Sequence, residues 1–252
     1  MASQPKVEAT VIVFDQGNTL LLEPFYNVIK RRENRFNDLC SNYGLSITGR
    51  QLIDEWAVAN KEVDYPYIAH FYQEEPIVQL ALRKLGVPET IAALLALDLL
   101  REYRIGLKEL ISTDPRTYEV KNTLQKLNSK GKMLGVFSND RIVGLNFVLD
   151  AMGVKSFFQY IETSESIGVE KPDPQVFQHI LGYFRQSPEF VVHVGDDPIM
   201  DIDGAKSQGL KAIKYCVDVD QFSELWRNYK AKPRFKPDAV IDHFSQLLGV
   251  VK

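Results

Sequence analysis

The stretch Val11-Ile12-Val13-Phe14-Asp15-Gln16-Gly17-Asn18-Thr19-Leu20-Leu21-Leu22 decides how this chain is organised. It opens with a short apolar run rich in β-branched side chains, which is typical of a parallel strand buried on both faces. Asp15 follows this run directly, and ligands of open parallel sheets bind beyond the carboxyl ends of the strands. Gly17 and Asn18 tolerate unusual backbone angles and suit a tight loop around a ligand. A functional site is therefore predicted here, although a lone Asp after a strand can also belong to a turn or a helix cap.

The composition is that of a globular protein with no basic surface for nucleic acid. Of the 252 residues, 45% are hydrophobic and 25% are charged, and the formal net charge is −3. Cys40 and Cys216 are too few for a disulfide framework and match no metal-binding spacing. The polar N-terminus has no signal-peptide pattern, and no apolar run could span a bilayer. We therefore expect a cytoplasmic protein that binds neither nucleic acid nor membranes.

Residues 22–111 are predicted to form a separate, all-helical domain. Apolar side chains at helical spacing between Phe25 and Tyr43 predict one long amphipathic helix that Gly44 ends. The segment 91–100 is apolar on nearly all sides, which predicts a helix buried between other helices or against another subunit. An all-helical insert directly after one buried strand suggests a cap domain placed over a site.

Strand and helix patterns alternate from residue 112 onward. Apolar runs predict further strands at 133–137, 157–161, 190–194, 211–215 and 237–241. Repeated strand–helix units imply a parallel sheet with helices on both faces. The predicted fold is therefore a doubly wound α/β core, residues 1–21 and 112–252, with a helical domain inserted after its first strand.

Polar side chains follow several of the predicted strand ends, so we expect them to converge at one edge of the sheet. They are Asp15 with Thr19, Ser138 with Asn139, Lys171, and Asp196 with Asp197 and Asp201. Two carboxylates can hold Mg²⁺ through oxygen ligands. A lysine and a hydroxyl group can bind a phosphoryl group, which leaves Asp15 free to attack phosphorus.

Four segments resemble, in order, the motifs of the haloacid dehalogenase-like (HAD) hydrolases. They are FDQGNTL at 14–20, VFSN at 136–139, VEKPDP at 169–174 and VGDDPIMDIDGA at 194–205. The helical insert is similar to the C1 cap of this superfamily in position and kind. The resemblance implies a Rossmann-like core and a phosphatase-type hydrolase that uses Mg²⁺ and an aspartyl-phosphate intermediate. The implied substrate is a small phosphorylated metabolite, which the sequence does not identify.

The resemblance also implies a role for each residue of the site. The catalytic residues would be Asp15 as nucleophile, with Ser138 and Lys171 on the phosphoryl group. The substrate-binding residues would be Thr19 and Asn139. The metal ligands would be Asp15, Asp196, Asp201 and the carbonyl of Gly17. For Asp201 a second role stays open, because it can also cap the following helix.

Position 17 departs from the family pattern. Phosphatases of the family usually have a second Asp there, which is implied to act as general acid and base. Gly17 keeps the backbone carbonyl that contacts the metal but lacks the acidic side chain. Because such a group is typically worth about 10²–10⁴ in rate, residual turnover is expected, above all with leaving groups that need little protonation. Asp197 is one candidate for a substitute acid or base.

Two alternative functions stay open. Gly17 favours a catalytically weak or inactive protein of this fold that binds phosphate or a phosphorylated ligand. A metal-free 2-haloacid dehalogenase would suit Asn139, but the Tyr usual in that motif is absent at position 17. We also expect His193 to be a packed strand residue and Asp203 to face solvent.

Overall fold

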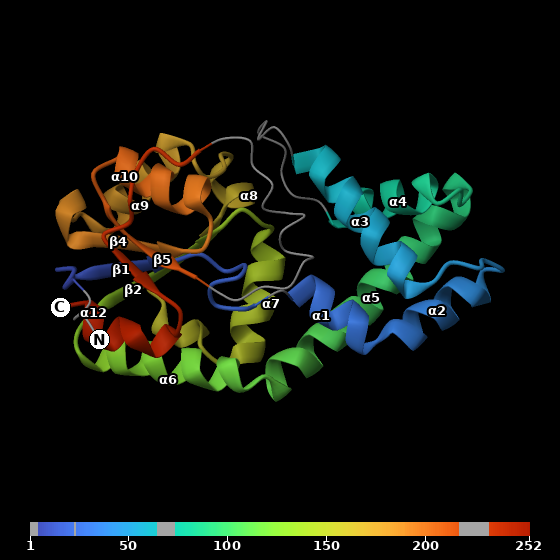
Figure 1. Ribbon diagram of the computed structural model, residues 1–252, viewed down its shortest axis with the longest axis horizontal. Coiled ribbons are helices and arrows are strands. Elements are labelled where there is room, and N and C mark those ends of the chain that lie inside the picture. Colours follow the sequence, from blue (N-terminus) through green and yellow to red (C-terminus); the bar gives the residue numbers. More distant parts are fainter. Residues whose placement is uncertain (1–4, 23, 65–73, 217–231) are drawn as a thin grey trace. The chain divides into compact units, whose positions relative to one another are not determined.

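The computed structural model describes residues 5–22, 24–64, 74–216 and 232–252, and they divide into two compact units (Figure 1). The first unit contains residues 5–22, 114–216 and 232–252, and the second contains residues 24–64 and 74–113. Within these described ranges, no helix has the length and apolar character needed to cross a membrane.

The first unit is built on a six-stranded parallel sheet. Its strands are β1 (Val11–Phe14), β2 (Met133–Ser138), β3 (Tyr160–Thr163), β4 (Val191–Gly195), β5 (Lys211–Tyr215) and β6 (Ala239–Ile241). They lie in the order β3-β2-β1-β4-β5-β6, and every neighbouring pair is parallel. The strand order changes direction between β1 and β4, where doubly wound sheets form their binding crevice. The predicted fold class is confirmed.

Helices cover both faces of this sheet. They are α6 (Pro115–Ser129), α7 (Ile142–Met152), α8 (Ser164–Ile167), α9 (Pro174–Phe184), α10 (Gly204–Ser207) and α12 (Leu247–Val250). Short 3₁₀ turns are η1 (Lys155–Phe157), η2 (Pro188–Phe190) and η4 (Phe244–Gln246), and η3 (Pro198–Asp203) is a π-helical turn. Figure 1 shows α9 and α10 on one side of the sheet and α6 and α12 on the other.

β1 lies at the centre of the sheet, and all four of its residues are fully buried. This burial is what its continuous apolar run predicts. Asp15 extends the ladder by one bond, because its backbone N–H donates to the carbonyl of Val194 at 2.9 Å. The sheet therefore fixes Asp15 at the carboxyl end of its central strand. By contrast, β3 starts three residues later than predicted, because 155–157 form η1.

The second unit is all-helical in its described residues. Its helices are α1 (Pro24–Arg31), α2 (Glu33–Asn42), α3 (Gly49–Asp64), α4 (Glu74–Lys84) and α5 (Glu89–Thr113). The helix α5 is the longest, and α1, α2 and α4 pack against it. This unit lies between β1 and α6 in the chain.

Two predictions for the second unit are wrong in detail. The single helix expected between Phe25 and Tyr43 is interrupted at Arg32, whose φ of −113° and ψ of 19° are not helical. Its guanidinium turns to α5, where it pairs with Glu102 and lies 2.6 Å from Glu109. The apolar segment 91–100 is buried on only one face, since Leu94 and Leu97 are 59% and 49% exposed.

Candidate functional site

A buried lysine joins two carboxylates at the carboxyl edge of the sheet. The Nζ of Lys171 donates to Asp15 Oδ1 at 2.6 Å and to Asp201 Oδ1 at 2.7 Å. Lys171 is 2% exposed and Asp201 is 1% exposed. A buried ion costs several kcal/mol of desolvation unless it is paired, and each carboxylate supplies part of that compensation. The structure thus brings together three residues that lie far apart in the sequence.

The position of Lys171 is set by the side-chain amide of Asn139, which follows β2. The backbone N–H of Lys171 donates to Asn139 Oδ1 at 2.9 Å, and Asn139 Nδ2 donates to the carbonyl of Lys171 at 3.0 Å. Asn139 Nδ2 also lies 3.6 Å from the sulfur of Met200. Both ends of the amide are therefore engaged within the protein. This geometry favours a positioning role for Asn139 over the predicted contact with substrate.

Asp201 accepts hydrogen bonds from three sides. Its Oδ1 lies 2.7 Å from Lys171 Nζ and 2.9 Å from His193 Nε2, and its Oδ2 accepts the backbone N–H of Asp197 at 2.9 Å. Gly195 makes room for this carboxylate, because a Cβ at that position would lie 2.2 Å from Asp201 Cγ. A carboxylate has about four acceptor sites, so about one remains on Asp201 for any other ligand.

Asp197 is the N-cap of η3. Its Oδ1 accepts the backbone N–H groups of Ile199 and Met200, both at 2.8 Å. Such bonds satisfy the otherwise unpaired amides at the start of a helical turn. They give Asp197 a structural role that competes with its proposed use as a substitute acid or base.

An acidic group suited to a cation lies beside the lysine. Asp15, Asp196 and Asp201 each offer one carboxylate oxygen, and these oxygens lie within 4.8 Å of one another. Asp15 and Asp196 follow the adjacent strands β1 and β4. Hard cations such as Mg²⁺ prefer oxygen ligands of this kind. Because Asp201 already accepts three hydrogen bonds, the residues that fit a magnesium site best are Asp15 and Asp196.

The loop after Asp15 leaves polar atoms buried without a partner. Thr19 is buried, and its Oγ1 has no hydrogen-bond partner among the described residues. The side-chain oxygen of Gln16 is also buried and has no hydrogen-bond partner among the described residues. Buried polar atoms of this kind call for an explanation, and a bound ligand is one. In the same loop, Asn18 has a φ of 52°, the left-handed conformation that its residue type tolerates.

Gly17 has space for a Cβ atom. A Cβ at this position would meet only Asp15 Oδ2, at 3.9 Å, which is an ordinary contact distance. Its backbone does not adopt a positive φ. Gly17 is therefore not required by local geometry, unlike Gly195. Ser138, the last residue of β2, is buried at the same edge of the sheet.

The charges of the site are strongly coupled. Burial raises the pKa of Asp15 to about 7, against the lowering effect of Lys171. Burial alone would also raise the pKa of Asp201, but Lys171 and His193 outweigh it and hold that pKa well below its usual range. Burial alone would lower the pKa of Lys171, yet the two carboxylates keep it above its usual value. Asp15 is thus the carboxyl group of the pair that gains a proton first.

Comparisons with known proteins identify the family. A family model of the haloacid dehalogenase-like hydrolases matches residues 9–209. The chain is a haloacid dehalogenase-like hydrolase. This HAD hydrolase is 35% identical, over 101 residues, to the human haloacid dehalogenase-like hydrolase domain-containing protein 3, a match that covers 38% of this chain and 39% of the relative. It is 30% identical, over 132 residues, to glyceraldehyde 3-phosphate phosphatase from Pyrococcus furiosus, a match that covers 52% of each.

A solved structure shows the same fold over nearly the full length. The HAD-hydrolase YfnB from Bacillus subtilis, in a crystal structure bound to magnesium, superposes on this HAD hydrolase with a TM-score of 0.67. The sequences are 19% identical, and 97% of each chain is covered. By contrast, the HAD hydrolase spans only 39% and 52% of the two curated relatives. The predicted superfamily and enzyme class, a hydrolase, are confirmed.

The burial of Asp203 differs from its prediction, and His193 makes a contact that was not predicted. Asp203 does not face solvent: it is 2% exposed and accepts the backbone N–H groups of Arg234 and Phe235 at 2.8 and 2.9 Å. His193 is packed in its strand as predicted, with its ring 5.6 Å from that of Phe177. Its hydrogen bond to Asp201 was not predicted. The sequence feature that could have indicated this bond is the single polar side chain, His193, within the otherwise apolar strand β4.

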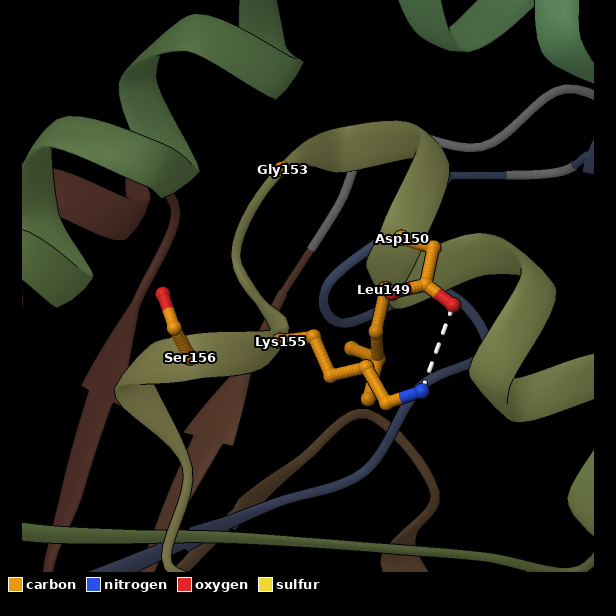
Figure 2. A pocket seen from close by; sticks show the side chains of 5 residues that line it. All are labelled: Leu149, Asp150, Gly153, Lys155 and Ser156. Atoms are coloured by element: carbon orange, nitrogen blue, oxygen red, sulfur yellow. Dashed lines mark hydrogen bonds and ion pairs between the residues drawn. The ribbon is translucent and has the colours of Figure 1, made fainter.

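A second concave region lies away from these residues. Figure 2 shows an open groove at the end of α7, lined by Leu149, Asp150, Gly153, Lys155 and Ser156. Lys155 pairs there with Asp150 at 3.2 Å. Because α7 starts after the carboxyl end of β2 and carries the chain about 16 Å, its end lies toward the opposite edge of the sheet. The groove shares no residue with the candidate site.

Proposed function

We propose that this HAD hydrolase is a Mg²⁺-dependent phosphatase that acts on a small phosphorylated metabolite through an aspartyl-phosphate. One observation carries the proposal: the Lys171 ammonium lies 2.6 Å from Asp15, within an acidic group whose oxygens are within 4.8 Å of one another. This arrangement combines a nucleophile, a fixed cation and a metal-binding set at the switch point of the sheet. The relative named glyceraldehyde 3-phosphate phosphatase supports the same reaction class.

In this mechanism an Asp15 carboxylate oxygen attacks phosphorus, and the bond between phosphorus and the leaving oxygen breaks. Water then attacks the aspartyl-phosphate and releases phosphate and free Asp15. Lys171 neutralises charge on the phosphoryl oxygens, while Ser138 and Thr19 are the candidate hydroxyl donors to them. Asp15, Asp196 and the carbonyl of Gly17 would hold Mg²⁺, which supplies further charge neutralisation when bound.

Gly17 shapes the expected substrate range. Without an acidic side chain at position 17, the leaving oxygen departs without a dedicated proton donor from that position. Such a loss typically costs about 10²–10⁴ in rate. The proposed enzyme therefore favours substrates whose leaving group is already a weak base.

The second unit is proposed to be the cap domain of this enzyme. Its limits differ by one or two residues from the predicted bounds of 22–111, since Leu22 belongs to the first unit and the second unit extends to Thr113. Two features support this assignment: its described residues are all helical, and it enters the chain directly after Asp15 and its loop. Cap closure would exclude bulk water and select the substrate.

The test is hydrolysis of an aryl phosphate with and without Mg²⁺. We expect turnover that needs Mg²⁺ and is abolished in Asp15→Asn. The matched control is Asp150→Asn, which removes the same charge from the exposed groove of Figure 2 and should leave the rate unchanged. A panel of phosphorylated metabolites extends the assay to substrates that aryl phosphates do not resemble.

Two other outcomes would assign a different function. If phosphate binds but neither the natural protein nor Gly17→Asp turns over any phosphate ester, the protein is a phosphate-binding member of the fold. Halide release from a 2-haloacid without Mg²⁺ would instead indicate a dehalogenase. The close set of three acidic residues speaks against that second outcome, because a metal-free reaction gives no reason to gather them.

A further inference from the structure

His193 occupies a position of the sheet that should be apolar. It lies in β4, where it is paired in register with Val13 of β1 and Ala212 of β5. Both of those neighbours belong to the apolar cluster that also contains Phe177. The imidazole is fully buried. A polar ring in such a row loses its hydration, so its presence needs a compensating interaction.

In the described structure, only one of the two ring nitrogens of His193 has a hydrogen-bond partner, and that partner is Asp201. His193 Nε2 lies 2.9 Å from Asp201 Oδ1, while Nδ1 has no hydrogen-bond partner in the described part of the structure. Since a carboxylate only accepts, the ring must carry its hydrogen on Nε2. A residue chosen for packing alone would not leave Nδ1 unsatisfied.

The contact continues to the nucleophile through two further bonds. The oxygen that His193 contacts, Asp201 Oδ1, also accepts from Lys171 Nζ at 2.7 Å, and Nζ in turn donates to Asp15 at 2.6 Å. An ammonium has three N–H donors, so two hold the carboxylates and a third is available to a phosphoryl oxygen. The direction of that third donor depends on where Asp201 is held.

We propose that His193 is a positioning residue of the active site: its imidazole donates from Nε2 to Asp201 and thereby fixes the Lys171 ammonium in the direction that the phosphoryl group requires. This inference rests on the proposed phosphatase function. His193 does not touch the substrate in this scheme. It lies at the outer end of the hydrogen-bonded series His193–Asp201–Lys171. Removal of a residue that orients an active-site group from outside typically lowers activity by about 10–100-fold.

The experiment compares three substitutions at the same position. His193→Gln keeps an N–H donor near the place of Nε2, His193→Asn is polar but too short to reach Asp201, and His193→Phe fills the space without a donor. We expect kcat for an aryl phosphate to fall about 10–100-fold in the Asn and Phe variants, with KM rising as binding of the phosphoryl group weakens. The Gln variant should recover most of the loss. His179→Gln, on the exposed face of α9, is the histidine control.

Two results would overturn the proposal. Equal kcat in the natural protein and His193→Asn would show that the bond to Asp201 has no effect on Lys171, and an equal loss in Gln and Asn would show that packing, not donation, matters. The comparison of His193→Gln with His193→Asn tests the proposal even if His193→Phe does not fold, because both substitutions are polar and similar in size.

Two readouts separate this proposal from the phosphatase assignment. Nitrogen NMR of the imidazole should show hydrogen on Nε2, and an Nε2 without hydrogen would overturn the proposal whatever the activity. Titration with inorganic phosphate should show weaker binding in His193→Asn but not in His193→Gln. If the natural protein binds phosphate in this pattern without turnover, the phosphatase assignment fails while the role of His193 stands.

Discussion

Asn139 holds Lys171 by both ends of its side-chain amide: Oδ1 accepts the backbone N–H of Lys171 at 2.9 Å, and Nδ2 donates to the carbonyl of the same residue at 3.0 Å. This pair of bonds links the end of β2 to the segment that precedes α9. It fixes the backbone of Lys171 while Asp15 and Asp201 fix its ammonium. Lys171 is thus held at both ends before any substrate arrives, and this preorganisation is what electrostatic catalysis needs.

Asn139→Asp should impair catalysis without a large effect on substrate affinity. The variant keeps an acceptor for the Lys171 N–H but loses the donor to its carbonyl, and two acceptors then face each other. We expect a loss of about 1–3 kcal/mol in the free energy of unfolding and at least about a tenfold lower kcat. Urea unfolding and steady-state kinetics measure both. Asn146→Asp is the control, because the side-chain hydrogen bond of Asn146 in the described part of the chain lies within α7, to the carbonyl of Ile142. A large rise in KM with normal kcat would instead support the predicted substrate contact.

Gly195→Ala should disrupt the site, because a methyl group there would lie 2.2 Å from Asp201 Cγ. The carboxylate has to move, which breaks its bonds to Lys171 and His193. Overpacking of this kind typically costs about 1–3 kcal/mol, and we expect kcat to fall by at least about 100-fold, since Lys171 loses its anchor. Gly182→Ala in α9 is the matched control: its Cβ would meet nothing within 4 Å. That variant should be slightly stabilised, by about 0.5–1 kcal/mol, with unchanged kcat.

The convergence of Asp15, Lys171 and the acidic residues could be predicted from sequence because parallel strands bring all their carboxyl ends to one edge. The buried run of Val11–Phe14 marks the central strand, and its end marks the site. Charges that follow several strands must then meet, whatever the lengths of the intervening helices. The fold and the observed convergence of these residues follow from that rule.

The bonds within the site could not be predicted in this way. The contact of His193 with Asp201 depends on which face of β4 the imidazole occupies and on the π-helical turn η3, neither of which has a local sequence signature. The burial of Asp203 depends on amide donors of Arg234 and Phe235, about thirty residues further along the chain. Sequence periodicity reports local exposure, whereas these partners come from distant segments.

Gly17→Asp should raise turnover, and should raise it most for poor leaving groups. A Cβ at position 17 is accommodated, since it would meet only Asp15 Oδ2, at 3.9 Å. A general acid assists departure of a basic alkoxide more than departure of a phenolate, so the gain should approach about 10²-fold for alkyl phosphates and be smaller for aryl phosphates. Rates across a series of leaving-group pKa values measure the slope. Gly17→Asn, which has the same size but no proton to give, should leave the slope unchanged. If both variants changed the rates equally for all leaving groups, the effect would come from the shape of the side chain and not from proton donation.

Removing the charge of Asp15 should stabilise the metal-free protein in a pH-dependent way. The pKa of Asp15 is about 7 in the folded protein and near 3.8 in the unfolded chain, so its contribution to stability is fully present below about pH 4 and is lost as pH rises to 7. Relative to Asp15→Asn, the natural protein should therefore lose up to about 4 kcal/mol across this interval. Urea unfolding with a metal chelator from pH 4 to 8 measures the difference, and Mg²⁺ should reduce it above pH 6. A difference that is constant with pH would show that Asp15 is already ionised throughout.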